Sequence, residues 1–179
     1  MNADFFEGNR QALLDRLGHG ALVVVTGYGE MQRGNDAAHL FEQEANFWYL
    51  TGIEAPDWWL IMDGNSGVSW LVRPDVEEMQ QIFDGSLDAK AAGRASGVKH
   101  IITRDEALIK LRALTKTHSV VYTVNQSKLV REHTHFQLNS AQSELYKLLE
   151  RTFQKVQDCY RDVAILRTIK QPQEIAAIE

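Results

Sequence analysis

The sequence predicts a single α/β domain with a mixed β-sheet flanked by helices. Three observations predict this class. The wholly apolar, valine-rich run 21–26 indicates a strand buried on both faces. Two further apolar runs flank the loop 63–67, whose glycines and length are typical of a hairpin. Beyond residue 85, helical and strand patterns alternate, as in the crossover units that join parallel strands.

The first half of the chain contains one predicted helix and four predicted strands. Residues 4–17 repeat apolar side chains at helical spacing, and Gly18 is suited to end that helix. The valine-rich strand follows. Residues 47–51 form an aromatic-rich run, which predicts a second strand because aromatic residues favour strands. Residues 58–62 and 68–72 are the two arms of the predicted hairpin.

Helices and strands alternate in the second half. Residues 75–83 predict a helix, and Ser86 is expected to cap a short, alanine-rich helix that Gly97 ends. A short strand is predicted at residues 100–103. The chain thus returns to the sheet after each helix, which favours one continuous domain.

Local capping signals define the remaining helices. Thr103 and Glu106 form a capping box, which predicts a helix immediately behind them. A strand is expected at 119–124, and the longest helix at 140–160. Pro172 suits the first turn of one more helix, where its missing N–H group costs nothing.

Composition excludes several classes of protein. The 179 residues suit one domain, and the net charge of −5 argues against a nucleic-acid partner, which usually meets a basic surface. No apolar run reaches eighteen residues, so we expect no membrane partner. The chain has one cysteine, Cys159, and its first residues do not resemble a secretory signal, so we expect a cytoplasmic location.

Two sets of side chains are candidates for metal chemistry. His133 and His135 can lie on one side of a strand, but a zinc site needs three or four ligands and the sequence places no third. A solvated loop is therefore the favoured interpretation. Four aspartates, at positions 36, 57, 63 and 84, suggest a two-metal nuclease, but turn geometry explains them better because Asp63 and Asp84 each precede a glycine.

Covalent and nucleotide chemistry have weak support. Cys159 falls on the apolar side of the predicted long helix, where a buried, inert thiol is expected. The chain contains no Gly-x-Ser-x-Gly motif. Gly27-Tyr28-Gly29 follows a strand but lacks the third glycine of a dinucleotide fingerprint.

The most specific pattern lies at residues 33–57, which read RGNDAAHLFEQEANFWYLTGIEAPD. This block resembles the amino-terminal domain of the aminopeptidase P, prolidase and creatinase family. The pattern of that family reads R-x-x-D, aromatic-x-Q, F-x-Y-L-T-G, and then an acidic residue near a proline. A second match is R-x-x-K-x-x-x-E-I, from Arg167 to Ile175, which in the family opens the first helix of the catalytic domain.

The resemblance implies a ribonuclease-H-like fold for residues 1–166, and a linker helix at 167–179 that leads into a separate C-terminal metallopeptidase domain. The parent enzyme would remove an N-terminal residue that precedes proline. It would use two divalent metal ions, manganese by resemblance, held by two Asp, one His and two Glu. None of those ligands is matched within residues 1–179. This chain alone is therefore expected to be inactive, with no catalytic residue, metal or cofactor of its own.

The same resemblance suggests which residues act at interfaces. Trp48, with Phe47 and Tyr49, is a candidate for controlling substrate access or forming a subunit contact. In a strand, alternation would place Phe47 and Tyr49 on one face and Trp48 on the other. Arg33, Asn35 and Asp36 are expected to order a loop. The implied partners are the chain's own C-terminal catalytic domain, further copies in a dimer or tetramer, and the peptide substrate.

Two alternatives remain open at this stage. The chain can belong to a prolidase-type or creatinase-type relative, because these share the amino-terminal domain. Departures at Glu42 and Phe83 blur the branch, although the Phe47-Trp48-Tyr49 run is most similar to aminopeptidase P. The other alternative is a stand-alone binding or oligomerisation module.

Overall fold

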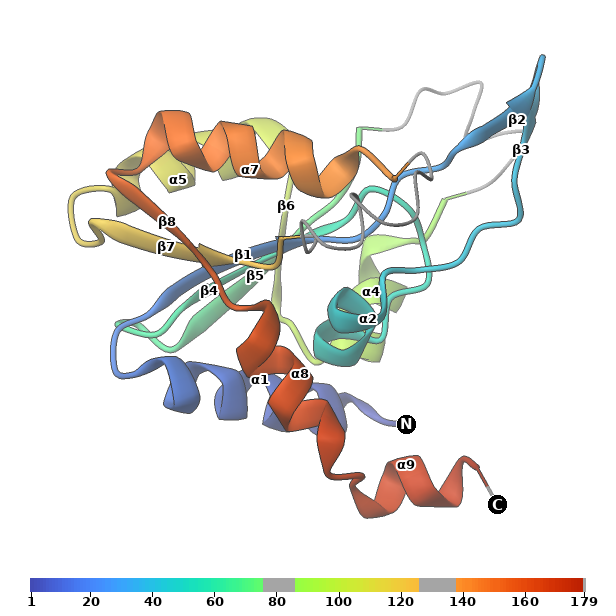
Figure 1. Ribbon diagram of the computed structural model, residues 1–179, viewed down its shortest axis with the longest axis horizontal. Coiled ribbons are helices and arrows are strands. Elements are labelled where there is room, and N and C mark those ends of the chain that lie inside the picture. Colours follow the sequence, from blue (N-terminus) through green and yellow to red (C-terminus); the bar gives the residue numbers. More distant parts are fainter. Residues whose placement is uncertain (76–85, 126–137, 179) are drawn as a thin grey trace.

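The middle layer of the structure is a six-stranded mixed sheet (Figure 1). In this computed structural model, residues 1–75, 86–125 and 138–178 are described. The strands of the sheet are β1 (Leu22–Thr26), β4 (Trp59–Asp63), β5 (Val68–Val72), β6 (His100–Ile102), β7 (Val120–Thr123) and β8 (Lys155–Asp158). Their spatial order is β6-β5-β4-β1-β7-β8.

Helices cover both faces of this sheet. On one face lie α5 (Arg104–Leu114) and α7 (Ala141–Thr152). On the other lie α1 (Ala3–Leu17), α2 (Ala45–Thr51), α4 (Ala89–Ser96) and α8 (Tyr160–Thr168). The last helix, α9 (Pro172–Ala176), extends from this second layer. Figure 1 also shows the small hairpin of β2 (Gln32–Gly34) and β3 (Ala37–Ala38) projecting away from the sheet.

The pairing of the strands matches the expected mixed sheet. Strand β4 is antiparallel to both β1 and β5, which confirms the hairpin. Strand β6 runs parallel to β5, β7 parallel to β1, and β8 parallel to β7. The antiparallel pairs thus come first in the chain, and the crossover connections follow. No helix in the described ranges is long and apolar enough to cross a membrane.

Strand β1 contributes to two separate cores. Val23 and Val25 pack toward α1 and α2, whereas Leu22 and Val24 pack toward α5 and α7. All five residues of β1 are buried, because helices cover both sides of the sheet at its centre. This arrangement explains why the sequence shows a continuous apolar run and no alternation.

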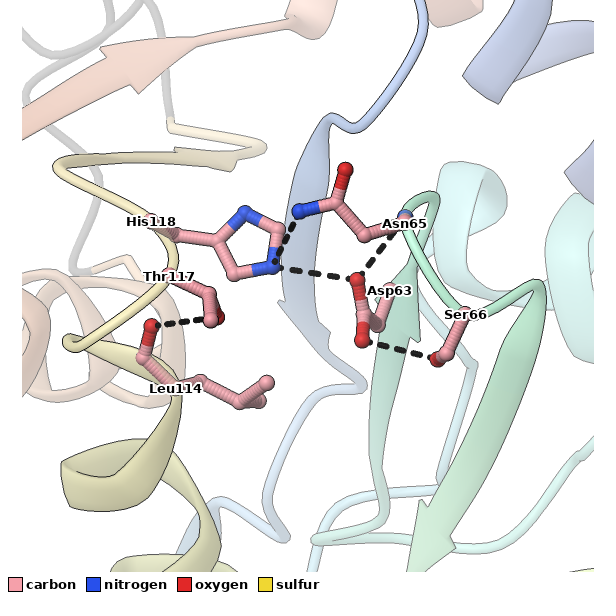
Figure 2. A network of polar contacts seen from close by, with 6 residues as sticks. All are labelled: Asp63, Asn65, Ser66, Leu114, Thr117 and His118. Atoms are coloured by element: carbon pink, nitrogen blue, oxygen red, sulfur yellow. Dashed lines mark hydrogen bonds and ion pairs between the residues drawn. The ribbon is translucent and has the colours of Figure 1, made fainter.

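A buried polar contact ties the hairpin to the segment that follows α5 (Figure 2). The Oδ1 atom of Asp63 lies 3.0 Å from Nε2 of His118. The same carboxylate accepts hydrogen bonds from the Asn65 backbone N–H and the Ser66 hydroxyl, at 2.9 and 2.7 Å. Asp63 therefore orders its own turn, as expected from its position before a glycine. These bonds, with His118, hold the pKa of Asp63 below its usual value although burial acts in the opposite direction.

The strand predicted at 47–51 is wrong, because these residues lie in helix α2. The helix depends on contacts at its two ends. The Glu44 carboxylate accepts a hydrogen bond from the Phe47 N–H, and Gly52 ends the helix in the left-handed conformation, with φ 67°. Such capping outweighs the strand preference of aromatic residues.

The helix predicted at 140–160 is confirmed only as far as Thr152, and its second part is wrong. Helix α7 ends at Thr152, Phe153 has extended backbone angles, and β8 then joins the free edge of β7. The apolar segment 163–166 belongs to a new helix, α8. Helical periodicity could not reveal this break, because the partner of β8 is about 35 residues away along the chain.

Smaller differences concern helix starts. Asp88, and not Ser86, caps α4, since its carboxylate accepts hydrogen bonds from the backbone N–H groups of residues 90 and 91. Gly97 does end that helix, with φ 75°. The capping box of Thr103 and Glu106 is confirmed, as is the helix that begins at Pro172. The helix predicted at 75–83 falls almost wholly outside the described residues.

Gly52 and Gly8 should respond to alanine in opposite directions. A Cβ atom on Gly52 would overlap the Phe6 ring and occupy a left-handed conformation, so Gly52→Ala should destabilise the fold by about 2 kcal/mol or more. Gly8 lies within α1 with open space around it, so Gly8→Ala should stabilise by about 0.5–1 kcal/mol. Urea unfolding monitored by circular dichroism measures both. Equal effects would contradict the assigned end of α2.

The Asp63 contacts predict a specific acid sensitivity. Because the folded-state pKa of Asp63 lies below the usual value of 3.8, the unfolded chain binds the proton more readily. The stabilisation by Asp63 is therefore present above that value and is lost as the pH falls through the folded-state pKa. Chemical unfolding is measured at several pH values between about pH 5 and about pH 2. Over this range the free energy of unfolding should fall more for wild type than for Asp63→Asn. Parallel pH profiles would show that these contacts carry no net stabilisation.

Candidate interaction groove

A groove of about 470 Å³ lies between α2 and the C-terminal helices. We call it the α2–α9 groove. Its lining residues are Phe41, Glu42, Gln43, Ala45, Trp48, Tyr49, Glu54, Arg167, Lys170 and Glu174. The volume falls within the usual range for sites that bind small molecules, about 300–1,000 Å³. Two parts of the chain more than a hundred residues apart therefore build one surface.

Trp48 is the aromatic side chain best placed to act at this surface. It is half-buried, and its ring meets the Phe6 ring edge-on, with 5.7 Å between centroids. Its indole Nε1 donates to the Glu54 carboxylate at 3.1 Å. These two contacts fix the ring while leaving part of it open to the groove. A rigid, partly exposed tryptophan is a common anchor in protein interfaces.

The neighbours of Trp48 have different surroundings. Phe47 is 1% exposed and belongs to the core, so its side chain does not reach the groove. Tyr49 is buried but lines the groove through its hydroxyl end, which accepts a hydrogen bond from Gln171 Nε2 at 3.3 Å. The expected alternation of a strand does not apply, because all three residues lie on a helix.

Polar side chains before α2 fix its amino end. The Gln43 amide accepts hydrogen bonds from the backbone N–H groups of Tyr28 and Glu44, and it donates to the Ala55 carbonyl at 2.9 Å. Glu44 then caps the helix through Phe47, at 2.7 Å. Burial raises the pKa of Glu44, although its hydrogen bonds act in the opposite direction.

The carboxyl end of α2 is held by α1. Asn9 Nδ2 donates to the Tyr49 carbonyl, and Arg10 Nη1 donates to the Leu50 carbonyl, both at 2.8 Å. Both donors are buried side chains. The last carbonyls of a helix have no partner within it, so these two bonds satisfy groups that would otherwise be stranded in the core.

A polar clasp holds the C-terminal segment against α1 and α2. Arg167 Nη1 donates to the Asn46 side-chain oxygen at 2.7 Å, and that asparagine in turn donates to Glu44. Gln171 Nε2 donates to the Asn9 side-chain oxygen at 2.6 Å. We call these contacts the α8–α9 clasp. They place the cations and carboxylates of α8 and α9 along one wall of the groove.

The groove has a mixed charge. Glu42, Glu54 and Glu174 face it together with Arg167 and Lys170. Such a lining can bind a polar peptide segment by ion pairs and hydrogen bonds, with Trp48 as the apolar contact. Among the described residues that line it, none is a serine or cysteine nucleophile beside a general base.

The predicted loop-ordering residues lie away from the groove. Arg33 is in β2, Asn35 turns the chain with φ 48°, and Asp36 follows it, all exposed. The turn is closed by a hydrogen bond from the Gln32 amide to the Asn35 carbonyl, at 2.6 Å. Asn35 thus adopts the turn conformation that asparagine tolerates well. A loop-ordering role for Arg33 and Asp36 stays a prediction.

Three of the four aspartates weighed as a metal cluster, at positions 36, 57 and 63, are described. Asp57 sits in a turn with φ 63°, and Asp63 is engaged with His118. No group of three or more His, Cys, Asp or Glu side chains within residues 1–75, 86–125 and 138–178 is arranged to hold a metal ion. His133, His135 and Asp84 lie outside these ranges.

Sequence reasoning missed the residues that position the groove. These residues are polar yet buried: Asn9, Arg10, Glu44 and Asn46. Each forms a hydrogen bond either to a group distant in the sequence or to a group at a helix end. One local signal was available. Glu44 stands three residues before Phe47, with Gly52 at the other end, a spacing that suits a short capped helix.

Comparisons with known proteins give a consistent result. Residues 6–122 match the family model of the aminopeptidase P N-terminal domain. The chain is 27% identical over 121 residues to a Xaa-Pro aminopeptidase of Escherichia coli K12, a match that covers 65% of this chain and 27% of that protein. By structure it resembles E. coli aminopeptidase P with the inhibitor Pro-Leu, with a TM-score of 0.78, 23% identity and 98% of this chain covered.

Two further solved structures share the fold. A Bacillus anthracis protein described as a candidate aminopeptidase P has a TM-score of 0.81 at 21% identity, with 98% of this chain covered. Proline aminopeptidase P II from Yersinia pestis has a TM-score of 0.73 at 22% identity, also with 98% of this chain covered. The chain spans 41–42% of the length of these solved chains.

The α8–α9 clasp predicts the effect of one substitution. Arg167→Ala removes the bond to Asn46, which leaves a buried amide short of a partner, and should weaken the attachment of α9 by about 1–3 kcal/mol. Hydrogen exchange should then speed up at residues 174–178, while the sheet keeps its protection. Arg161→Ala removes an exposed arginine from the same helix and is the matched control. Equal exchange in the two variants would rule out the clasp.

Proposed function

Because the chain belongs to the family of aminopeptidase P N-terminal domains, we propose that it serves a Xaa-Pro aminopeptidase as a non-catalytic domain. In this role it shapes the entrance to the active site and supports assembly of an oligomer. The parent enzyme removes an N-terminal residue that precedes proline. The curated relative supports this assignment, because it is itself a Xaa-Pro aminopeptidase.

The α2–α9 groove is the observation that carries the proposal. Trp48 lines it together with Arg167 and Glu174, two residues of the segment that resembles the opening of the family's catalytic domain. A side chain at that junction is well placed to narrow a path for peptides or to contact a second subunit. The fixed orientation of Trp48, between the Phe6 ring and the Glu54 carboxylate, suits either task.

The metal chemistry belongs, in this proposal, to another domain. The family resemblance supports this part, because the five metal ligands that it implies have no match within residues 1–179. By that resemblance, we assign the two divalent ions, manganese in the family, to the C-terminal catalytic domain. The partners that follow are that domain, further copies of the same protein, and a peptide substrate, in a cytoplasmic enzyme.

Trp48→Ala in the full-length enzyme tests the access role. If Trp48 narrows the entrance, its removal should raise kcat/KM for long Xaa-Pro peptides relative to a Xaa-Pro tripeptide, because only the longer substrates meet the restriction. The ratio of the two kcat/KM values is the measurement, with oligomer mass followed by light scattering. Tyr160→Ala is the matched control, since Tyr160 is 45% exposed and does not line the groove.

The outcomes separate the parts of the proposal. An unchanged ratio with a reduced oligomer mass would leave only the assembly role, and no change in either would refute both. The isolated chain of 179 residues should show no hydrolysis with manganese present. Turnover that survives contaminant controls, or stoichiometric manganese in that chain, would refute the non-catalytic assignment.

A further inference from the structure

A second cavity, of about 260 Å³, lies between α1, the start of β5 and the segment that joins α4 to β6. It shares no lining residue with the α2–α9 groove. The residues that matter for its chemistry are Glu7, Arg10, Ser69, Lys99 and His100. The cavity is therefore an independent feature of the domain, and the proposed function does not use it.

Arg10 is the buried group of this cavity. Its side chain is part of the core, since the residue is 5% exposed, yet it lines the cavity. Among the described residues its one hydrogen bond is from Nη1 to the Leu50 carbonyl. No carboxylate in the described ranges forms an ion pair with it. A guanidinium carries five N–H donors, and the bond to the Leu50 carbonyl uses one of them. No Arg10 nitrogen is among the fully enclosed, unpartnered side-chain atoms of the described residues, so its remaining donors are not closed off from solvent.

The charge of Arg10 is retained despite its burial. Burial lowers the pKa of Arg10 to about 10, and Glu7 acts in the opposite direction. The guanidinium is thus still a cation at neutral pH. A buried cation without an ion pair is costly, and an anion placed in the adjacent cavity would offset that cost.

The rim of the cavity adds positive charge. Lys99 and His100 are both exposed and both line it. Glu7 is the one carboxylate among the lining residues. Two basic side chains, Arg10 and Lys99, therefore line the cavity with one carboxylate, in a chain whose net charge is −5. This local excess runs against the overall charge of the protein and favours an anionic ligand.

The size of the cavity limits the ligand. Its volume of about 260 Å³ lies below the usual 300–1,000 Å³ of sites that enclose drug-sized molecules. Arginine binds phosphate through parallel N–H donors, and lysine binds it as a point charge. We infer that this cavity binds a phosphate group, either as inorganic phosphate or at the end of a small phosphate monoester. Arg10 is the buried partner, Lys99 the partner at the rim, and Glu7 the competing anion.

Calorimetric titration of the full chain with inorganic phosphate tests this inference, with sodium chloride used to keep the ionic strength constant. Glycerol phosphate in a second arm separates the free ion from a monoester. Lys99→Gln should weaken binding by about two- to fivefold, because one cation at the rim is lost. Glu7→Gln should strengthen it by a similar factor, because the competing carboxylate is removed. Lys116→Gln removes an exposed lysine elsewhere and should leave binding unchanged.

Arg10 itself is not substituted, because its loss would also remove the hydrogen bond to the Leu50 carbonyl and disturb the fold. The opposite signs at Lys99 and Glu7 are the decisive result, since a purely structural role for Arg10 would produce neither. The inference is overturned if neither phosphate nor the monoester binds, or if both variants bind as wild type does. It is also overturned if Lys116→Gln weakens binding as much as Lys99→Gln, which would show a nonspecific ionic effect.

Discussion

Two hydrogen bonds from α1 to the carboxyl end of α2 fix the position of α2, on which the α2–α9 groove depends. Asn9 and Arg10 reach the carbonyls of residues 49 and 50, about 40 positions along the chain. A helix as short as α2 is not stable alone, so its length and direction depend on such contacts. Its direction in turn sets the position of Trp48. Arg10 contributes to the α2–α9 groove and to the second cavity, because one of its nitrogens bonds to α2 while its side chain lines that cavity.

Local and strongly periodic signals predicted most of the sheet and several helix ends. The valine-rich run of β1 was recognisable because burial on both faces removes alternation, and the hairpin of β4 and β5 because its loop has the right residues and length. The capping box at Thr103 needs only four consecutive residues, and it was found for that reason. The block 33–57 carried the family resemblance, which the match at residues 6–122 confirms.

Contacts between distant segments explain what the sequence could not predict. Helix α2 looks like a strand by composition, and its helical form rests on Glu44, Gly52 and the donors of α1. Strand β8 forms because it pairs with the free edge of β7. A search for helical periodicity covers only neighbouring residues, so it cannot detect this pairing. The groove joins residues such as Asn46 and Arg167, which are 121 positions apart. The family resemblance singled out Trp48, whereas its orientation comes from Phe6 and Glu54.

The burial of Cys159 turns the chain's one thiol into an intrinsic probe of opening. It lies between β8 and α8, is fully buried, and has its pKa raised to about 12 by that burial. A thiol so protonated and enclosed does not react with alkylating reagents in the closed state. Its modification rate therefore reports how often this junction separates from the core. Because the native surface is free of reactive thiols, a cysteine introduced beside the α2–α9 groove can carry a single spectroscopic label without any background substitution.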